Sequence, residues 1–120
     1  MLFRSEVTGQ YEAFAFSAAT KTLYAFVWNE FCDWYLEAIK ARLYGDDAAS
    51  KRAASETALF AIERILGILH PIAPFVTEEL WAFLPDRDGL LARSAFPSAD
   101  GIPRDPEAAA TVAEIGRAHV

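Results

Sequence analysis

The chain has 120 residues, a hydrophobic fraction of 53%, and 17 acidic against 11 basic side chains, which give a net charge of −6 at pH 7. This length suits one domain with its own core, and the apolar content is too high for a disordered segment. Polar residues interrupt every apolar run before it reaches the about 20 residues that span a membrane, so we expect no membrane contact. We predict a single domain over residues 1–120.

The cysteine content and the N-terminus indicate a cytoplasmic location. MLFRSEVTGQ lacks the basic run, apolar stretch and small-residue cleavage site of a secretory signal. The single cysteine, Cys32, has no partner for a disulfide or a metal cluster, and we interpret it as a small core residue in a reducing compartment. The acidic balance argues against a dedicated nucleic-acid module, whose footprint is normally basic.

The first half of the chain predicts two helices. One covers about Phe3 to Ala13, and Ser17 is placed to cap the next. The second runs from Ala18 to about Tyr44 without Gly or Pro, and Gly45 ends it. Its apolar residues recur at three- and four-residue steps in two neighbouring stripes, which predict buried faces. The stripes are Leu23, Val27, Phe31, Trp34 and Ala38, and Tyr24, Trp28, Tyr35 and Ile39.

Two more helices are expected before a turn-rich connection over residues 85–106. Ser50 is the expected cap of a third helix that reaches His70. Pro71 ends or bends that helix, and Pro74 suits the first position of a fourth. The core stripe of the third helix is Leu59, Ile62, Leu66 and Leu69.

The C-terminal part predicts a short extended piece and one more helix. The extended piece covers Leu90 to Phe96, within the turn-rich connection. The last helix covers Glu107 to Val120, places Val112, Ile115 and His119 on one side, and lacks a C-terminal stop signal, so we expect a truncated chain. The fold class is therefore all-α, a bundle of about four to five helices.

The segment LHPIAPFVTEELW could describe a catalytic pocket or a corner between two helices. His70, Glu78 and Glu79 lack a spacing such as H-E-x-x-H that would place them on one helix face. A histidine at a helix C-terminus is stabilised by the helix dipole, which is an ordinary structural role. The chain also lacks a Gly-rich phosphate loop and a serine elbow. We therefore predict a corner, with no catalytic residue and no metal ligand.

Two long motifs in this chain resemble the helical anticodon-binding domain of valyl-tRNA synthetases, which are class I enzymes. VWNEFCDWYLEAIKARLYG is followed, after a loop, by ALFAIERILGILHPIAPFVTEELW, and the resemblance covers roughly Arg4 to Pro97. The matching positions are Trp28, Asn29, Phe31, Cys32, Asp33, Trp34, Tyr35, Leu36 and Glu37 in the first motif, and His70, Pro71, Pro74, Phe75, Thr77, Glu78, Glu79 and Trp81 in the second. The valyl form is favoured over the related isoleucyl and leucyl enzymes.

The resemblance implies a bundle that docks the anticodon stem and loop of a tRNA for valine. Aminoacylation, with its ATP and Mg, belongs to a catalytic domain of the same synthetase, whose H-I-G-H and K-M-S-K-S signatures this chain lacks. We expect no cofactor in this domain. The family's upstream helix is missing as well, so we expect either an excised fragment or a stand-alone relative.

Five polar residues are candidate tRNA contacts by position. They are Arg4, Lys21, Asn29, Lys40 and Arg42. An alternative is a purely structural bundle that braces the synthetase, and another is a bundle that holds a small apolar ligand among its aromatic side chains.

Overall fold

A computed structural model describes the backbone of residues 2–118 and the side chains of residues 3–114. Within these residues the chain is helical and has no strand, which confirms the all-α prediction. None of the described helices combines the length and the apolar character needed to cross a membrane. The elements are α1 (Leu2–Glu12), α2 (Phe16–Tyr24), the π-helix η1 (Ala25–Leu36), α3 (Glu37–Leu43), α4 (Ala48–Leu69), α5 (Pro74–Ala82), the 3-10 helix η2 (Leu91–Arg93) and α6 (Pro106–Ala118).

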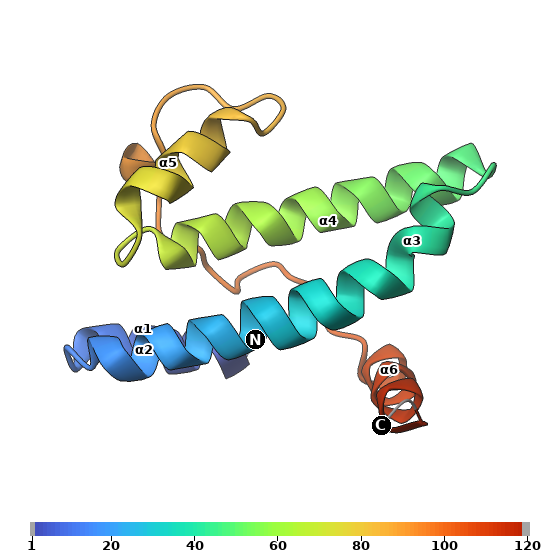
Figure 1. Cartoon of the computed structure of the whole chain (residues 1–120), viewed down its shortest axis with the longest axis horizontal. Helices are drawn as coiled ribbons and strands as arrows, with labels where there is room; N and C mark the ends of the chain where they lie inside the picture. Colours follow the sequence, from blue (N-terminus) through green and yellow to red (C-terminus); the bar gives the residue numbers. More distant parts are fainter. Residues whose placement is uncertain (1, 119–120) are drawn as a thin grey trace.

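The helices form an open arrangement around α4 (Figure 1). α2, η1 and α3 follow one another without a break and form one long helix that lies beside α4. α1 packs on α2, and α5 packs on α4 near its C-terminal end. The connection after α5 crosses behind α4, and α6 stands apart at its end. With the long helix counted as one and the single turn η2 left out, the described chain has five helices, within the four to five expected from the sequence.

The core consists of three small clusters, and α4 contributes to each of them. Ile68 packs with Val7 and Leu23 from α1 and α2. Ala54 and Ala58 pack under Ile39 at the other end of the long helix, where small residues allow α3 and α4 to approach closely. The third cluster joins α4, α5 and η2 and is formed by Leu66, Trp81 and Leu91. α4 is therefore the element that holds the other helices together.

Both serine caps expected from the sequence are wrong. α2 begins at Phe16 after Ala15, and no side chain caps it. α4 begins earlier than expected, because Asp47 is its N-cap and its carboxylate accepts hydrogen bonds from the backbone N–H groups of Ala49 and Ser50, at 3.0 and 3.2 Å. An aspartate is as good an N-cap as a serine, and its negative charge also suits the positive end of the helix.

The stripe predictions for the long helix are wrong at some positions of both stripes. η1 is a π-helix of 12 residues, which winds more loosely than an α-helix and shifts the register of the side chains that follow. Ile39 and Phe31 are buried, but Ala38 is exposed, and Tyr24 and Trp28 expose 65% and 55% of their surface. The helix continues past Ala41 and ends at Leu43. Gly45 follows it, where a Cβ atom would lie 2.8 Å from the carbonyl oxygen of Ala41.

The segment LHPIAPFVTEELW is a corner, as predicted. α4 ends at Leu69, and Pro74 is the first residue of α5. Thr77 is 1% exposed, and its hydroxyl donates to the carbonyl oxygen of Ala73 at 2.7 Å. Because a hydroxyl carries one hydrogen, Thr77 Oγ1 acts as the acceptor for His70 Nδ1–H at 2.9 Å. This chain of hydrogen bonds fixes α5 against the end of α4.

The predicted extended piece at Leu90 to Phe96 is wrong. Leu91–Arg93 forms the 3-10 helix η2, because the Glu78 carboxylate accepts from the backbone N–H groups of Leu91 and Ala92, at 2.5 and 3.1 Å. Side-chain capping of this kind stabilises a short helix that its own hydrogen bonds would not maintain. Leu91 is buried by the turn that results.

The following connection is held on α4 by a close contact and one long-range hydrogen bond, and on α1 by another. A Cβ atom on Gly67 would lie 2.6 Å from the Pro97 ring, so only glycine allows this approach. Arg4 Nε donates to the carbonyl oxygen of Pro97, and Arg64 Nη1 donates to that of Ser98, at 2.9 and 2.8 Å. The connection therefore joins α1 to α4.

α6 begins at Pro106, close to the expected start of the last helix. Val112, placed on its apolar side by the sequence, is 56% exposed. The side chain of Ile115 and the whole of His119 lie outside the described residues.

Candidate nucleic-acid interface

Two of the five candidate contacts, Lys21 and Asn29, lie on the long helix and are accessible. Lys21 is the basic residue of α2, and Asn29 lies in the first half of η1. Both side chains are exposed. No hydrogen bond or ion pair joins either of them to another described residue, so both are available to a partner.

Lys40 and Arg42 lie together at the C-terminal end of the long helix, where it meets α4. Lys40 Nζ is 2.5 Å from Glu37 Oε1, and this hydrogen bond with the nearby charge holds the pKa of Lys40 above its ordinary value. Arg42 donates to the hydroxyl and to the carbonyl oxygen of Ser50, at 2.9 and 3.3 Å. Each of the two cations already has an acceptor inside the domain.

Arg4 is not part of this group. It lies on α1, is half-buried, and donates from Nε to the carbonyl oxygen of Pro97. Its position is explained by its role in holding the connection on the bundle. Of the five candidates, Lys40 and Arg42 lie at one end of the long helix because they are two residues apart in the sequence. Lys21 and Asn29 lie earlier on that helix, and Arg4 lies on α1.

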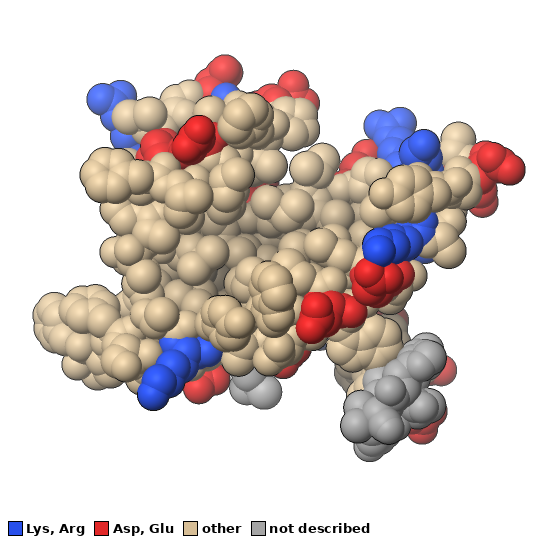
Figure 2. Space-filling view, in the orientation of Figure 1, with Lys and Arg blue, Asp and Glu red and all other residues tan. Residues whose placement is uncertain are grey.

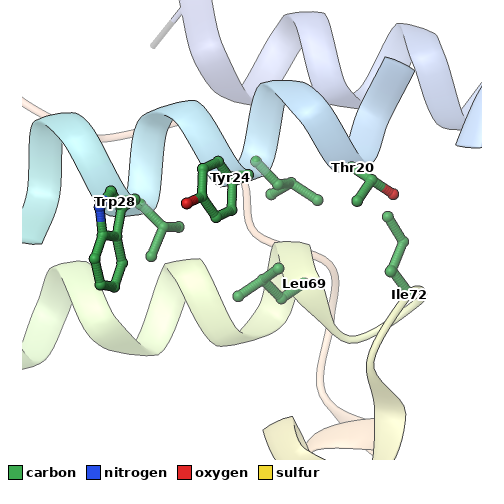
Figure 3. A pocket seen from close by; sticks show the side chains of 7 residues that line it. Thr20, Tyr24, Trp28, Leu69 and Ile72 are labelled. Carbon is green, nitrogen blue, oxygen red and sulfur yellow. The ribbon is translucent and has the colours of Figure 1, made fainter. Parts of the chain in front are cut away.

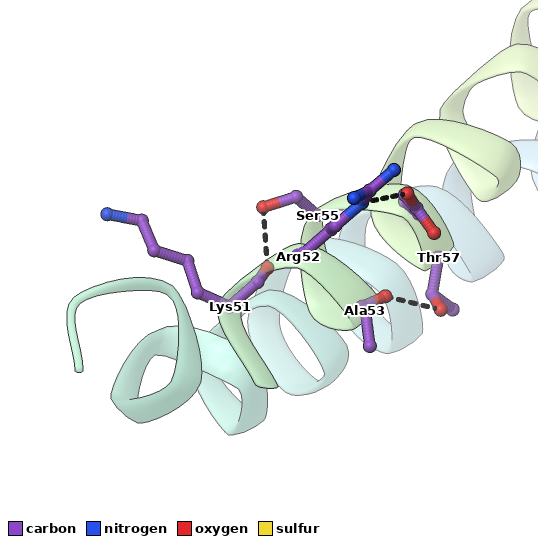
Figure 4. A network of polar contacts seen from close by, with 6 residues as sticks. Lys51, Arg52, Ala53, Ser55 and Thr57 are labelled. Atoms are coloured by element: carbon purple, nitrogen blue, oxygen red, sulfur yellow. Dashed lines mark hydrogen bonds and ion pairs between the residues drawn. The ribbon is translucent and has the colours of Figure 1, made fainter. Parts of the chain in front are cut away.

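Sequence reasoning missed one cation in the first turn of α4, next in sequence to the Ser50 that Arg42 contacts. Lys51 lies in the first turn of α4, directly after Ser50, and its side chain extends away from the helix (Figure 4). Among the described residues Lys51 Nζ has no hydrogen bond or ion pair, whereas its neighbour Arg52 binds Glu56 at 2.9 Å. Recognising Asp47 as the N-cap of α4 would have identified Lys51 as a candidate, because this cap places Lys51 on the exposed first turn of the helix.

The charges on the face shown in Figure 2 are sparse and mixed. Basic and acidic side chains alternate over the end where α3 and α4 meet. Uncharged residues line the hollow between the long helix and α4. An isolated ion pair on such a surface contributes little, so electrostatic attraction of a polyanion here depends on a few unpaired cations. Lys21 and Lys51 are the two described above.

The hollow is an apolar groove between the long helix and the α4–α5 corner (Figure 3). Tyr24 and Trp28 form one side, and Leu69 and Ile72 form the other. The groove has a volume of about 240 Å³ and no charged residue in its lining. It is completed by Leu23, Val27 and Thr20. The sequence assigned Tyr24 and Trp28 to the core, and only the structure shows that their rings are accessible.

The described residues contain no group of three or more His, Cys, Asp and Glu side chains that could hold a metal ion. His70 and Glu78 are both engaged in structural hydrogen bonds, as described for the corner and for η2. What the surface offers chemically is binding through cations, amides and aromatic rings.

Comparison of the sequence with known protein families identifies the class to which this all-α domain belongs. Residues 3–118 match the family described as anticodon-binding domain of tRNA ligase. Because the match covers nearly the whole chain, the chain belongs to this family.

Curated relatives of the chain are valine–tRNA ligases. The protein from Caulobacter vibrioides is 47% identical over 116 residues, which cover 93% of this chain and 12% of the relative. The proteins from Desulfotalea psychrophila and Latilactobacillus sakei are 46% and 39% identical and are matched over 81% and 87% of this chain, and over 11% and 12% of their own lengths. The chain thus spans about one-eighth of the length of these relatives, and its similarity is to valine–tRNA ligases in particular.

Proposed function

We propose that this domain binds the anticodon stem and loop of a tRNA for valine. The observation that carries the proposal is the match of residues 3–118 to an anticodon-binding family, together with the similarity to valine–tRNA ligases. In this role the domain contributes tRNA affinity and identity. Aminoacylation, with its ATP and Mg, takes place in a catalytic domain of the same ligase.

The RNA contact in this proposal rests on few cations, in keeping with the net charge of −6. Lys21 and Lys51 are exposed and unpaired among the described residues, and Lys40 and Arg42 add two charges that are partly satisfied by Glu37 and Ser50. Two phosphate contacts give a slope of about −1.5 in a plot of log binding constant against log salt concentration. A shallow salt dependence is therefore part of the proposal.

The experiment that tests the proposal compares two RNA hairpins from one tRNA for valine. One carries the anticodon stem and loop, the other the acceptor stem, and each is titrated with the chain by fluorescence anisotropy. We expect tighter binding of the anticodon hairpin. Equal affinity for the two hairpins, or no binding of either, would contradict the proposed function.

The salt dependence tests which cations take part. Lys21→Ala and Lys51→Ala should each lower the size of the salt slope by about 0.8, because each removes one phosphate contact. Arg104→Ala is the matched control, since Arg104 is an exposed cation in the connection before α6. Unchanged slopes for both lysine variants would exclude them from the interface.

We also propose that the outer side of α5 packs against another part of the ligase. Val76, Leu80 and Phe83 follow each other at helical spacing and are exposed, and Phe75 beside them is 89% exposed. A contiguous apolar patch of this kind marks an interaction site. The relatives, about eight times longer than this chain, offer the surface to cover it. Leu80→Ser with Phe83→Ser should reduce the binding of a hydrophobic dye to the chain, and unchanged dye binding would contradict this role.

A further inference from the structure

The groove on the long helix contains a ready-made aromatic stack. The rings of Tyr24 and Trp28 lie with their centroids 6.3 Å apart and their planes 11° from parallel. More than half of each side chain is exposed, although rings of this size usually contribute to a core or an interface. Both belong to the junction of α2 and η1, where the helix changes its winding, and π-helical segments are frequent at functional sites.

The size and lining of the groove restrict what it can hold. Its volume of about 240 Å³ lies below the about 300–1,000 Å³ that encloses a drug-sized ligand, which leaves room for a single planar ring. Leu69 lies across the groove from Tyr24, and Ile72 and Thr20 lie at the end of the groove away from Trp28 (Figure 3). Such a lining favours stacking and does not select a particular hydrogen-bonding pattern.

The charges around the groove differ at its two ends. Lys21 lies one turn before Tyr24 on the same side of the helix, is exposed and has no partner among the described residues. Beyond Trp28 the helix carries the exposed carboxylates Glu30 and Asp33. A phosphate attached to a ring in the groove is therefore attracted toward the Tyr24 end, next to Lys21, and repelled from the other.

We propose that an unpaired base of the RNA loop stacks on the Tyr24–Trp28 pair, with a neighbouring phosphate at Lys21. This inference rests on the proposed function and names the residues that receive a base. RNA-binding domains commonly capture splayed-out loop bases on aromatic side chains, and this stacking tolerates any base because each has a π-face. Here the two rings already form a stack, and the base extends it over the apolar floor of the groove.

The test uses the hairpin with the anticodon stem and loop, and the same stem as a blunt duplex without the loop. Binding of the hairpin should quench the tryptophan fluorescence of the chain, and the duplex should not. Trp28→Phe should retain the affinity for the hairpin, because the aromatic platform remains, and should lose the part of the quenching that comes from Trp28. Of the other two tryptophans, Trp81 is buried and Trp34 is half-buried, six residues further along the helix. Trp28→Ala should raise the Kd for the hairpin about 5- to 100-fold. Phe14→Ala is the control, since Phe14 is 78% exposed and lies in the α1–α2 turn.

The outcomes separate this inference from the proposed function. If the wild-type chain binds the hairpin but Trp28→Ala binds it equally well, the stacking site is overturned and the proposed function stands. If the wild-type chain does not bind the hairpin, both fail. If the chain self-associates and Trp28→Ala abolishes the self-association without changing RNA binding, the groove holds a protein surface, and the inference is again overturned. Far-ultraviolet circular dichroism of each variant shows whether the helices are retained.

Discussion

Replacement of Thr77 by valine tests the hydrogen bonds that hold the α4–α5 corner. The side chain is 1% exposed, and valine has nearly the same shape, so the packing is retained and the hydroxyl is lost. The hydroxyl's donation, which is shared between the carbonyl oxygens of Ala73 and Pro74, disappears together with the hydrogen bond that it accepts from His70 Nδ1. At about 0.5–1.5 kcal/mol each, their loss costs about 1–3 kcal/mol.

The lower half of this range is the expected result, because both former partners keep some compensation. The Ala73 carbonyl oxygen still accepts from the backbone N–H of residue 77 at 3.2 Å, and His70 is only half-buried and can bind water. We expect a loss of about 1–2 kcal/mol in the free energy of unfolding, or about 4–8 °C in Tm for a chain of this size. Urea and thermal unfolding followed by circular dichroism measure both quantities.

The matched control is Thr57→Val on α4. Thr57 makes the same bond to the carbonyl oxygen four residues earlier, that of Ala53 at 2.9 Å, but it is exposed and has no histidine partner (Figure 4). Its replacement should change the stability by less than about 0.5 kcal/mol. Equal losses for the two variants would refute the reasoning, because the corner would then depend on no buried hydrogen bond.

Three further changes test the account of the fold. Asp47→Ala should lower the free energy of unfolding by about 1 kcal/mol, because α4 loses its N-cap, whereas Asp46→Ala at the neighbouring position should lower it much less. Equal losses of the two variants in urea unfolding would contradict the assigned cap. Gly67→Ala should lower the free energy of unfolding by about 1–3 kcal/mol, because its Cβ atom would overlap the Pro97 ring. Gly9→Ala, in α1 with open space around it, should raise the free energy of unfolding by about 0.5–1 kcal/mol. A stabilising effect of Gly67→Ala would disprove the close contact. Burial raises the pKa of Tyr11 above 10.0, so the stabilisation from its hydroxyl is complete below that pH and is lost as the pH rises through the raised value. The loss in free energy of unfolding caused by Tyr11→Phe, measured with urea, should therefore be smaller at about pH 11 than at about pH 8. An equal loss at the two pH values would contradict the role of this hydroxyl.

The sequence predicts the elements that depend on local signals. Pro71 and Pro74 locate the corner because proline restricts the backbone whatever its surroundings, and the long apolar periodicity locates α4. The serine caps fail because several residues near a helix start can cap it, and only the folded chain selects one. The extended piece fails because a distant side chain, Glu78, supplies the hydrogen bonds that turn Leu91–Arg93 into a 3-10 helix.

The candidate site is predicted less well than the fold. Arg4 is a cation by sequence, but its contact with Pro97 depends on a connection more than 90 residues away. Tyr24 and Trp28 follow a helical stripe, yet they border the open groove between the long helix and the α4–α5 corner, which leaves them exposed. Whether a residue is free to bind a partner is a property of the tertiary structure, and no local pattern encodes it.

The most direct test of the central claim is a titration of this chain against a transcribed tRNA for valine and a version whose anticodon is replaced, at low and near-physiological salt. Our account predicts preferential binding of the natural tRNA at both salt concentrations, with a shallow loss of affinity as salt increases. Equal binding of the two tRNAs would contradict the claim that residues of this chain read the anticodon loop.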